Sequence, residues 1–224
     1  MKYNSINIIT IDGTSGSGKS TISRLLSKKL SYNLLDSGKL YRSVGYLASE
    51  VSKSLDDITN LDQLISELSL KTNSRTNEFE IFYKNKIIDH LLYDERVGKA
   101  ASIVSKIPSV RDSMLVLQHS CVNKKGLIAN GRDMGSEVFP DAKLKLYINA
   151  SLDVRAKRRY DELVNKGDDV IFEDILNSLR KRDESDMNRA ISPLKIPNNA
   201  HVIDTSNLKP DAIVDKILNL YTIT

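Results

Sequence analysis

Residues 6–21 of this 224-residue chain read INIITIDGTSGSGKST, and this stretch decides the fold class. Its first half is rich in β-branched residues, which is typical of a buried strand, and its second half is rich in glycine. Gly13 and Gly18 lie five residues apart and are followed by Lys19 and Ser20. With a strand before it and an amphipathic stretch after it, this spacing predicts a loop that binds nucleotide phosphates.

Phosphate binding explains the glycines, because the backbone must approach the ligand closely and adopt conformations that a Cβ forbids. Successive N–H groups and the start of the next helix then surround the phosphates. We expect Lys19 to reach the β- and γ-phosphates of ATP and the Ser20 hydroxyl to ligate Mg²⁺. The flanking strand and helix argue against a chance match, but the loop alone leaves open what happens to the γ-phosphate. The residues expected to bind ATP here are Gly13, Thr14, Ser15, Gly16, Ser17, Gly18, Lys19, Ser20 and Thr21.

Short aliphatic segments recur along the chain, at residues 6–11, 33–35, 127–129, 144–148 and 201–203. Between most of them the apolar residues follow helical spacing. Strands that alternate with helices predict an α/β fold with a doubly wound, parallel, five-stranded sheet. In such a sheet the ligand site lies at the carboxyl ends of the strands.

One region, residues 68–89, departs from this alternation. Phe79, Ile81 and Tyr83 recur with a period of two, and Asn85 and Lys86 suit a turn. We therefore expect a small antiparallel insert.

Two helices are expected after this insert. The first should run from near Asp94 to a point before Pro108. The second should begin with Ser109 as its N-cap and run toward Gly126.

Composition limits the function classes. The net charge of +4 comes without a long basic run, which argues against a nucleic-acid-binding tail. No apolar stretch is long enough to span a bilayer, so we expect a cytoplasmic protein without membrane or nucleic-acid partners. The lone Cys121 fits a buried helix position, and the histidines lack metal-ligand spacing.

Arginines and carboxylates gather after the predicted strands. Residues 34–42 read LLDSGKLYR, and residues 131–135 read GRDMG. Arg182, Asp186 and Arg189 have the spacing of one helix face, on a helix that Pro193 should end. Because phosphoryl transfer depends on alignment and charge neutralisation, these groups predict a site for a phosphorylated acceptor.

Together these motifs resemble those of the bacterial cytidylate kinases. The phosphate-binding loop, residues 34–42, KAASIVSKIPSVR (99–111), GRDMGSEVFPDA (131–142) and RDESDMNRAISPL (182–194) follow that family's order and spacing over nearly the whole chain. The resemblance implies a P-loop kinase fold, ATP and Mg²⁺ as co-substrates, CMP or dCMP as acceptor, and a monomer. It also implies a core of residues 1–65 and 98–224, a monophosphate-binding insert of residues 66–97, and a mobile helical lid at residues 154–168.

The resemblance also implies roles for individual residues. Arg42, Arg132 and Arg189 would hold the acceptor phosphate, and Arg182 and Asp186 the sugar. Ser102, Arg111 and Asp133 would face the cytosine, with Ser37 as a positioning residue. Lys19, Arg132, Arg189 and Arg159 would be catalytic, and Arg158 would contact ATP.

Simpler readings stay open for some of these residues. Arg182 and Asp186 have the spacing of an ordinary helix ion pair, and Arg132 with Asp133 suits a turn. The lid arginines 155, 158 and 159 lie near Asp161 and could form a solvated charged face with it.

The sequence departs from the family pattern at two positions. Asn130 stands where the family usually has an aspartate, which P-loop enzymes often use to hold Mg²⁺. Asp36, at the neighbouring strand end, could replace that carboxylate. Thr14 stands where the family often has proline, which changes only loop stiffness. The rival functions are a kinase for UMP, AMP or shikimate, and a P-loop protein that binds ATP without transferring phosphate.

Overall fold

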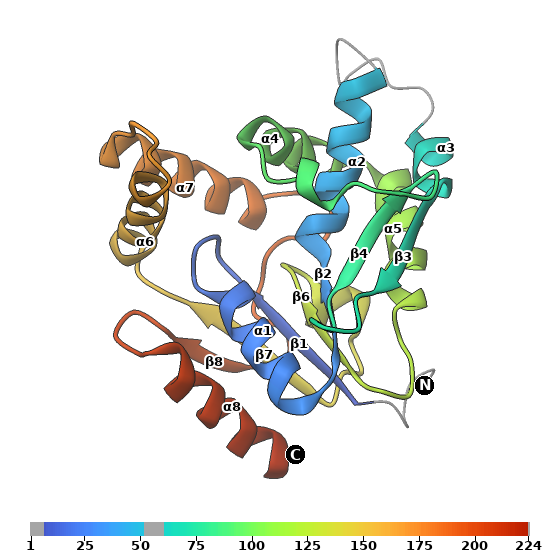
Figure 1. Ribbon diagram of the computed structural model, residues 1–224. Helices are drawn as coiled ribbons and strands as arrows, with labels where there is room; N and C mark the ends of the chain where they lie inside the picture. Colours follow the sequence, from blue (N-terminus) through green and yellow to red (C-terminus); the bar gives the residue numbers. More distant parts are fainter. Residues whose placement is uncertain (1–6, 52–60, 224) are drawn as a thin grey trace.

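The computed structural model describes residues 7–51 and 61–223 (Figure 1). At its centre lies a parallel sheet of five strands in the order β2-β6-β1-β7-β8. The prediction of a doubly wound five-stranded sheet is confirmed, although residue 6 of the first expected strand lies outside the described residues. The strands are β1 (Ile8–Gly13), β2 (Asn33–Asp36), β6 (Leu127–Asn130), β7 (Leu144–Asn149) and β8 (His201–Asp204).

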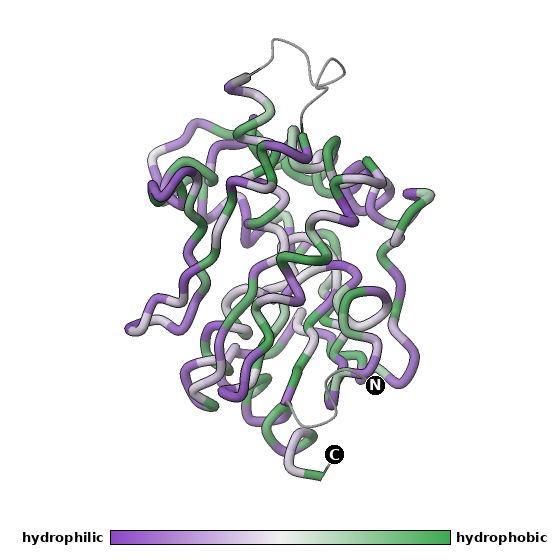
Figure 2. Tube along the Cα trace, turned by 90° about the vertical axis from the view of Figure 1, so that its right-hand side faces the viewer, coloured by the Kyte–Doolittle hydropathy of each residue, from purple (hydrophilic) through white to green (hydrophobic). Residues whose placement is uncertain are grey.

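Both faces of this sheet are covered, which explains why its strands are apolar on both sides. Ile9 and Ile11 pack in a cluster with α1 (Lys19–Leu30) and α8 (Pro210–Ile223). Ile8 belongs to a second cluster, which includes residues of α2 (Ser37–Val51), α3 (Leu61–Ser66) and the insert. Along the whole chain, short hydrophobic and hydrophilic stretches follow one another (Figure 2).

The two helices after the insert are α4 (Glu95–Val104) and α5 (Pro108–Ser120). Asp94 is the N-cap of α4 and accepts from the backbone N–H of Arg96. The prediction of Ser109 as the N-cap of the second helix is wrong, because Ile107 holds that position and Pro108 is the first helical residue. Proline suits this place, since the first turn leaves its N–H groups unpaired.

The insert is a three-stranded antiparallel sheet, as predicted, made of β3 (Leu68–Thr72), β4 (Phe79–Tyr83) and β5 (Lys86–Ile87). Its turn lies one residue earlier than predicted: Lys84 and Asn85 have positive φ, and Lys86 already pairs with Tyr83. Ile81 is fully buried and joins the insert to the main core.

The turn between β3 and β4 docks on the edge of the main sheet. The backbone N–H of Leu34 in β2 donates to the carbonyl of Asn77 at 2.9 Å, and Leu34 forms a parallel bridge with Glu78. Arg24 of α1 donates to the Glu78 carboxylate at 2.9 Å. The insert therefore covers part of the edge that β2 would otherwise expose.

Helices α6 (Leu152–Asn165) and α7 (Phe172–Met187) stand beside each other at one side of the molecule (Figure 1). Ala156, Leu176 and Leu179 form a small core between them. The expected lid, residues 154–168, falls on α6 and the turn after it. The prediction that Arg189 shares a helix with Arg182 and Asp186 is wrong, because α7 ends at Met187.

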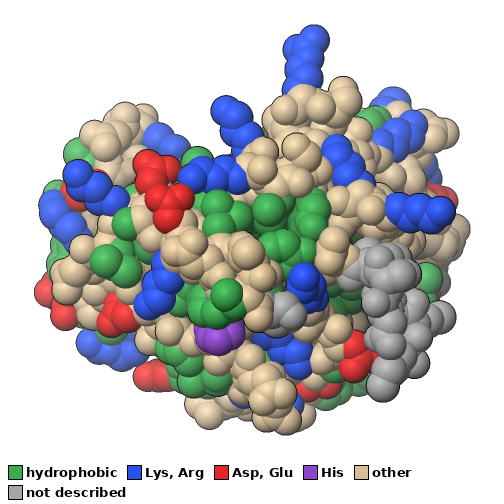
Figure 3. All heavy atoms as spheres, turned by 90° about the horizontal axis from the view of Figure 1, so that it is seen from below, with side chains coloured by type: hydrophobic (Ala, Val, Ile, Leu, Met, Phe, Trp, Pro, Cys, Tyr) green, Lys and Arg blue, Asp and Glu red, His purple; other side chains and the backbone are tan. Residues whose placement is uncertain are grey.

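On the face seen from below, charged side chains of both signs are interspersed around a central apolar area (Figure 3). Within residues 7–51 and 61–223, none of the helices combines the length and hydropathy needed to cross a bilayer. Cys121 is buried on α5, as expected, and burial raises the pKa of its thiol to about 12.

Candidate active site

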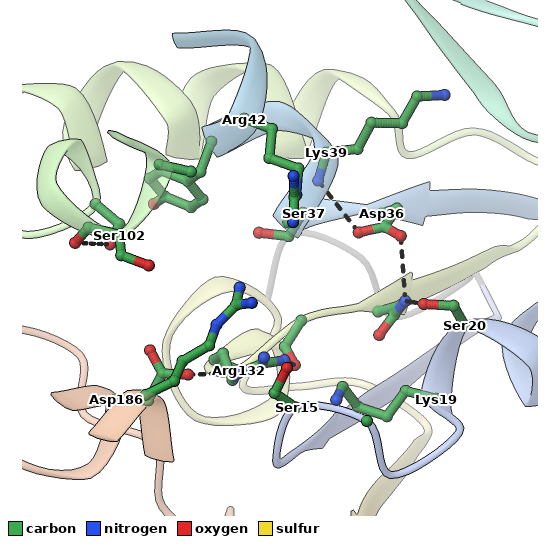
Figure 4. Close-up of a pocket in the computed structure, with 18 of the residues that line it drawn as sticks. Ser15, Lys19, Ser20, Asp36, Ser37, Lys39, Arg42, Ser102, Arg132 and Asp186 are labelled. Atoms are coloured by element: carbon green, nitrogen blue, oxygen red, sulfur yellow. Dashed lines mark hydrogen bonds and ion pairs between the residues drawn. The ribbon is translucent and has the colours of Figure 1, made fainter. Parts of the chain in front are cut away.

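A cleft of about 540 Å³ opens at the carboxyl ends of β1, β2 and β6, where the fold class predicts a ligand site (Figure 4). The phosphate-binding loop and α1 form one wall, and α2, α4 and the end of α7 form the others. The predicted residues that line it are Ser15, Gly16, Lys19, Ser20, Thr21, Ser37, Arg42, Ser102, Arg132, Asp133, Arg182, Asp186 and Arg189. Gly13, Thr14, Ser17 and Gly18 complete the loop, whereas Arg111, Arg158 and Arg159 lie outside the lining.

The loop backbone depends on glycine at its first position. Gly13 has a φ of 143°, and a Cβ there would lie 1.8 Å from the carbonyl oxygen of Ile148 on the neighbouring strand. Lys19 is buried and donates to the carbonyl of Thr14 at 2.5 Å. Burial, and then the nearby charge of Arg132, lowers the pKa of the Lys19 ammonium group. The group therefore needs an anion to balance its charge.

Two polar residues outside the predicted set, Asn149 and Thr205, anchor the loop. Thr14 donates through its hydroxyl to the Asn149 side chain at 3.0 Å, at the end of β7. Thr205, just after β8, donates to the carbonyl of Ser17 at 2.8 Å. Thr14 thus ties the loop to the sheet. Nothing in the sequence near Thr205 signals its contact, which arises only when β8 is placed beside β7.

The acceptor arginines converge opposite the loop. Arg132 donates from Nε to Asp186 at 2.8 Å. Burial would raise the pKa of the Asp186 carboxyl, but Arg132, Arg182 and Arg189 together hold it below its ordinary value. Burial and the charge of Arg132 lower the pKa of Arg182 to about 10. The cluster therefore carries more positive charge than its carboxylate balances.

Two nitrogens of this cluster are buried without a hydrogen-bond partner among the described residues: Nε of Arg182 and Nη2 of Arg189. Unsatisfied buried donors are rare in folded proteins and cost free energy, more so when they carry charge. Both residues line the cleft that contains Lys19. The phosphate and sugar oxygens of a bound nucleotide could satisfy these donors, and its phosphate would balance the charge.

The residues expected to face the base lie at the far end of the cleft. Asp133 accepts a hydrogen bond from Arg111 Nη2, and both side chains are buried. Arg111 also lies over the ring of Tyr41 and donates to the carbonyl of Ser105. Asp133 lines the cleft, whereas Arg111 supports it from behind. The hydroxyl of Ser102 donates to the carbonyl of Gly98 at 3.2 Å.

Ser37 and Arg42 hold their places through partners that the sequence did not indicate. The Ser37 hydroxyl accepts from the side chain of Gln118 on α5 at 2.9 Å. Arg42 donates from Nη1 to the carbonyls of Leu92 at 2.9 Å and Asp94 at 3.2 Å. Both residues of α2 are therefore oriented by groups from other segments: Ser37 by α5, and Arg42 by the stretch between β5 and α4.

Asp12 is a buried carboxylate that the sequence interpretation left without a role. It accepts from the backbone N–H groups of Met134 and Gly135, both at 2.8 Å. These amides begin the short turn η3 (Met134–Val138), directly after Arg132 and Asp133. Burial raises the pKa of Asp12 to about 6, although the two amide bonds oppose this rise. The sequence signal that could have indicated a role for Asp12 is its position, as a carboxylate at the end of an apolar strand.

The lid arginines separate into three environments. Arg155 is buried, forms an ion pair with Asp183 at 2.6 Å and donates to the carbonyl of Ser15 at 3.0 Å. Arg158 donates to the hydroxyl and the carbonyl of Thr205. Arg159 pairs with Glu162 at 2.9 Å on an exposed face. Arg159 therefore belongs to a solvated charged face, as the simpler reading of the sequence suggested, whereas Arg155 does not.

The expected metal ligand, Ser20, lies beside two polar side chains. Asn130 donates from Nδ2 toward Ser20 Oγ at 3.3 Å and toward Asp36 Oδ2 at 3.5 Å (Figure 4). Within the described residues no group of three or more His, Cys, Asp or Glu side chains could hold a metal ion. A hydroxyl, a carboxylate and ligand phosphates suit Mg²⁺, which takes few protein ligands when it is bound with a nucleotide.

Comparisons with known proteins identify related sequences and structures. A family model described as cytidylate kinase matches residues 9–223. The cytidylate kinase of Aeromonas salmonicida (strain A449) is 39% identical over 94% of this chain and 92% of its own. The cytidylate kinase of Marinomonas sp. (strain MWYL1) is 40% identical over 94% of this chain and 93% of its own.

A solved structure of an uncharacterized protein from Eubacterium ventriosum ATCC 27560 is also similar. It has a TM-score of 0.53 at 15% identity and covers 96% of this chain and 98% of that one. At this identity the likeness concerns the fold alone.

Proposed function

The chain belongs to the cytidylate kinase family, and we propose that it transfers the γ-phosphoryl group of ATP to CMP or dCMP, giving ADP and CDP or dCDP. One observation carries most of the weight: buried guanidinium nitrogens of Arg182 and Arg189 lack partners in a cleft shared with the phosphate-binding loop. A loop for one phosphate chain facing donors for another is what phosphoryl transfer between two nucleotides requires.

On the donor side, the loop amides and Lys19 would surround the phosphates of ATP. The Lys19 ammonium group already lies over the loop, in contact with the Thr14 carbonyl. Its buried charge would neutralise the negative charge that develops on the transferring group. Because Lys19 is preorganised, little rearrangement would accompany the reaction.

On the acceptor side, Arg42, Arg132 and Arg189 would hold the phosphate of CMP, and Arg182 with Asp186 the sugar. The phosphate oxygen that attacks is already anionic near neutral pH, so no general base is needed. Asp133 would accept from the amino group of cytosine, with Arg111 fixing the carboxylate from behind. Uracil has a carbonyl where cytosine has an amino group, so the same carboxylate would repel UMP.

When it is bound, Mg²⁺ would supply positive charge that neutralises part of the charge on the phosphates of ATP. Ser20 would hold it through its hydroxyl, with Asp36 and Asn130 beside it. From the resemblance we also propose that the protein acts as a monomer in the cytoplasm and that residues 154–168 close over ATP.

An acceptor panel tests this function. ADP release is measured with CMP, dCMP, UMP, AMP and no acceptor, and a Lys19→Ala preparation serves as the control for contaminating kinases. We expect turnover with CMP and dCMP well above the other acceptors, and none of it in the control. Absence of turnover with every monophosphate would contradict the proposed activity. A preference for UMP or AMP would show that the acceptor is that nucleotide and not CMP.

A further inference from the structure

Asp36 differs from the other carboxylates of the cleft. Four acidic residues line it, and three of them form ion pairs: Asp133 with Arg111, Asp186 with Arg132, and Glu162 with Arg159 and Lys166. Asp36 forms no ion pair with any cation in the described part of the chain. Its charge acts on Lys19, Arg24 and Arg42 without a direct ion pair, so the carboxylate can still contact a positive ligand.

The sheet places this charge beside the expected metal ligand. Asp36 and Asn130 end the neighbouring strands β2 and β6 and are register partners. The Asn130 amide nitrogen lies between Asp36 Oδ2 and Ser20 Oγ (Figure 4). The other carboxylate oxygen of Asp36 accepts from the backbone N–H of Lys39 at 3.2 Å, which fixes its orientation.

Asn130 itself cannot supply a charge. Its amide nitrogen donates toward both neighbours, so it orients the Ser20 hydroxyl and the Asp36 carboxylate with respect to each other. Mg²⁺ prefers oxygen ligands and is commonly held by a carboxylate together with nucleotide phosphates. At these strand ends, Asp36 is the group that meets this requirement.

Resting on the proposed function, we propose that Asp36 supplies the negative charge that holds Mg²⁺ against the bound nucleotide beside Ser20, with Asn130 as a positioning residue between them. The charge that a P-loop kinase often places at the end of β6 lies here one strand away.

The proposal is tested by moving the carboxylate from position 36 back to position 130. The proteins compared are the wild type, Asp36→Asn, Asn130→Asp and the double variant. Asp36→Glu keeps the charge, and Asp215→Asn is a control on α8, where the carboxylate is exposed and pairs with Lys29. Electron paramagnetic resonance measures the dissociation constant of Mn²⁺ for the protein–ADP complex, with Mg²⁺ as competitor. Calorimetry measures ADP binding without metal.

We expect Asp36→Asn to weaken Mn²⁺ binding about tenfold or more, since it removes the unpaired charge beside the ion. Metal-free ADP should bind as tightly as to wild type, or more tightly, because a carboxylate near the phosphates repels them. Asn130→Asp should tighten Mn²⁺ binding, and the double variant should return close to wild type. Asp36→Glu should stay within about threefold of wild type.

Unchanged Mn²⁺ affinity in Asp36→Asn would overturn the proposal. So would equal weakening of ADP binding with and without metal, because Asp36 would then shape the site without acting on the ion. If Asp36→Asn does not fold, unchanged Mn²⁺ affinity in Asn130→Asp overturns the proposal in its place. The titrations contain no acceptor, so a failure of the acceptor panel remains distinguishable from a failure here.

Discussion

Lys19 carries a charge that the ligand-free cleft tolerates poorly, since burial lowers its pKa. Its contacts are to the loop, at Thr14 and Ser17, and not to the apolar core. We predict that Lys19→Ala lowers kcat by about a hundredfold or more, because a preorganised cation is lost from the transferring phosphate.

Lys19→Met keeps the volume and removes the buried charge. It should lose the same activity while its melting temperature without ligand stays equal to wild type or rises. Wild-type turnover in either variant would mean that the loop is not the site of transfer.

Asp133, which we propose reads the base, also forms a buried ion pair with Arg111. Asp133→Ala would leave that arginine unpaired and confound binding with stability, since breaking a buried pair costs about 3–5 kcal/mol. We therefore predict the outcome for Asp133→Asn, which preserves the shape. The ratio of kcat/KM for CMP to that for UMP should fall, with about 1–3 kcal/mol of transition-state binding lost for CMP.

The KM for ATP is the control for Asp133→Asn and should not change. Equal losses for CMP and UMP would show that Asp133 aligns Arg132 and does not read the base.

Asp12 gives the folded protein a pH dependence whose sign is defined. Its pKa is raised from 3.8 to about 6, so the folded state binds the proton more tightly than the unfolded state. Its contribution to stability is complete below pH 4 and is lost as the pH rises through 6. The loss is on the order of 3 kcal/mol, at about 1.4 kcal/mol per pKa unit.

Urea unfolding of wild type and Asp12→Asn between pH 4 and 7.5 checks this prediction. The wild type should lose free energy of unfolding relative to the variant over that interval. A difference that does not vary with pH would contradict the raised pKa.

At the scale of elements, α2 and α4 cross closely because each has a glycine at the contact. A Cβ on Gly45 would lie 2.6 Å from the backbone nitrogen of Ala101, whereas one on Gly98 would lie 2.9 Å from the guanidinium of Arg42. Backbone cannot move aside easily, but the end of an arginine can. The same substitution should therefore have two different effects.

We predict that Gly45→Ala lowers the melting temperature by several degrees, as expected for about 1–3 kcal/mol of overpacking. Gly98→Ala should leave the melting temperature nearly unchanged and raise the KM for CMP, because Arg42 is displaced. Thermal unfolding and acceptor kinetics on both variants decide this. An unchanged KM for CMP in Gly98→Ala would show that Arg42 does not bind the acceptor phosphate.

Helix boundaries show where sequence reasoning succeeds and where it stops. The start of α4 was predicted near Asp94, and the structure shows that this carboxylate is its N-cap. The end of α7 was missed because spacing alone carried Arg189 onto the helix. In the structure Arg189 donates from Nε to the carbonyl of Ser192 at 2.5 Å, so a loop and not a helix positions it. Local patterns indicate which residues are present at a site, whereas loop geometry decides how they meet.

Over the whole molecule, the number and parallel direction of the main strands followed from the alternation of apolar segments with helical ones, but the strand order β2-β6-β1-β7-β8 did not. The contacts that sequence could not give are those between distant segments, such as Thr205 with Ser17 or Gln118 with Ser37. These depend on which strands become neighbours, and local patterns carry no information about that. Most of the predicted residues therefore line one cleft, but the sequence did not indicate the groups that orient them.

Helices α6 and α7 carry groups expected to contact both nucleotides. Arg158 lies on α6, Arg182 and Asp186 lie on α7, and the pair of Arg155 with Asp183 joins the two helices. A ligand that fixes this body for one nucleotide should therefore favour the other.

We predict that ADP tightens CMP binding about fivefold or more, within the usual range of coupling between sites. Asp183→Asn should reduce this factor. Asp174→Asn, which removes an acidic side chain from the first turn of the same helix, should not. Calorimetric titration of CMP with and without ADP measures the coupling. Equal coupling in all three proteins would contradict the role of the ion pair.

The docking of Asn77 and Glu78 on Leu34 also bears on aggregation. An uncovered strand edge is a template on which another chain can add a strand, and β2 contains buried Leu34 and Leu35. The insert therefore shields an apolar edge of the main sheet. The opposite edge, β8, has only four residues, and its His201 and Asp204 are exposed and polar, which makes it a poor template. Shortening the turn between β3 and β4 would thus expose an aggregation-prone strand edge on a chain whose phosphate-binding loop is intact.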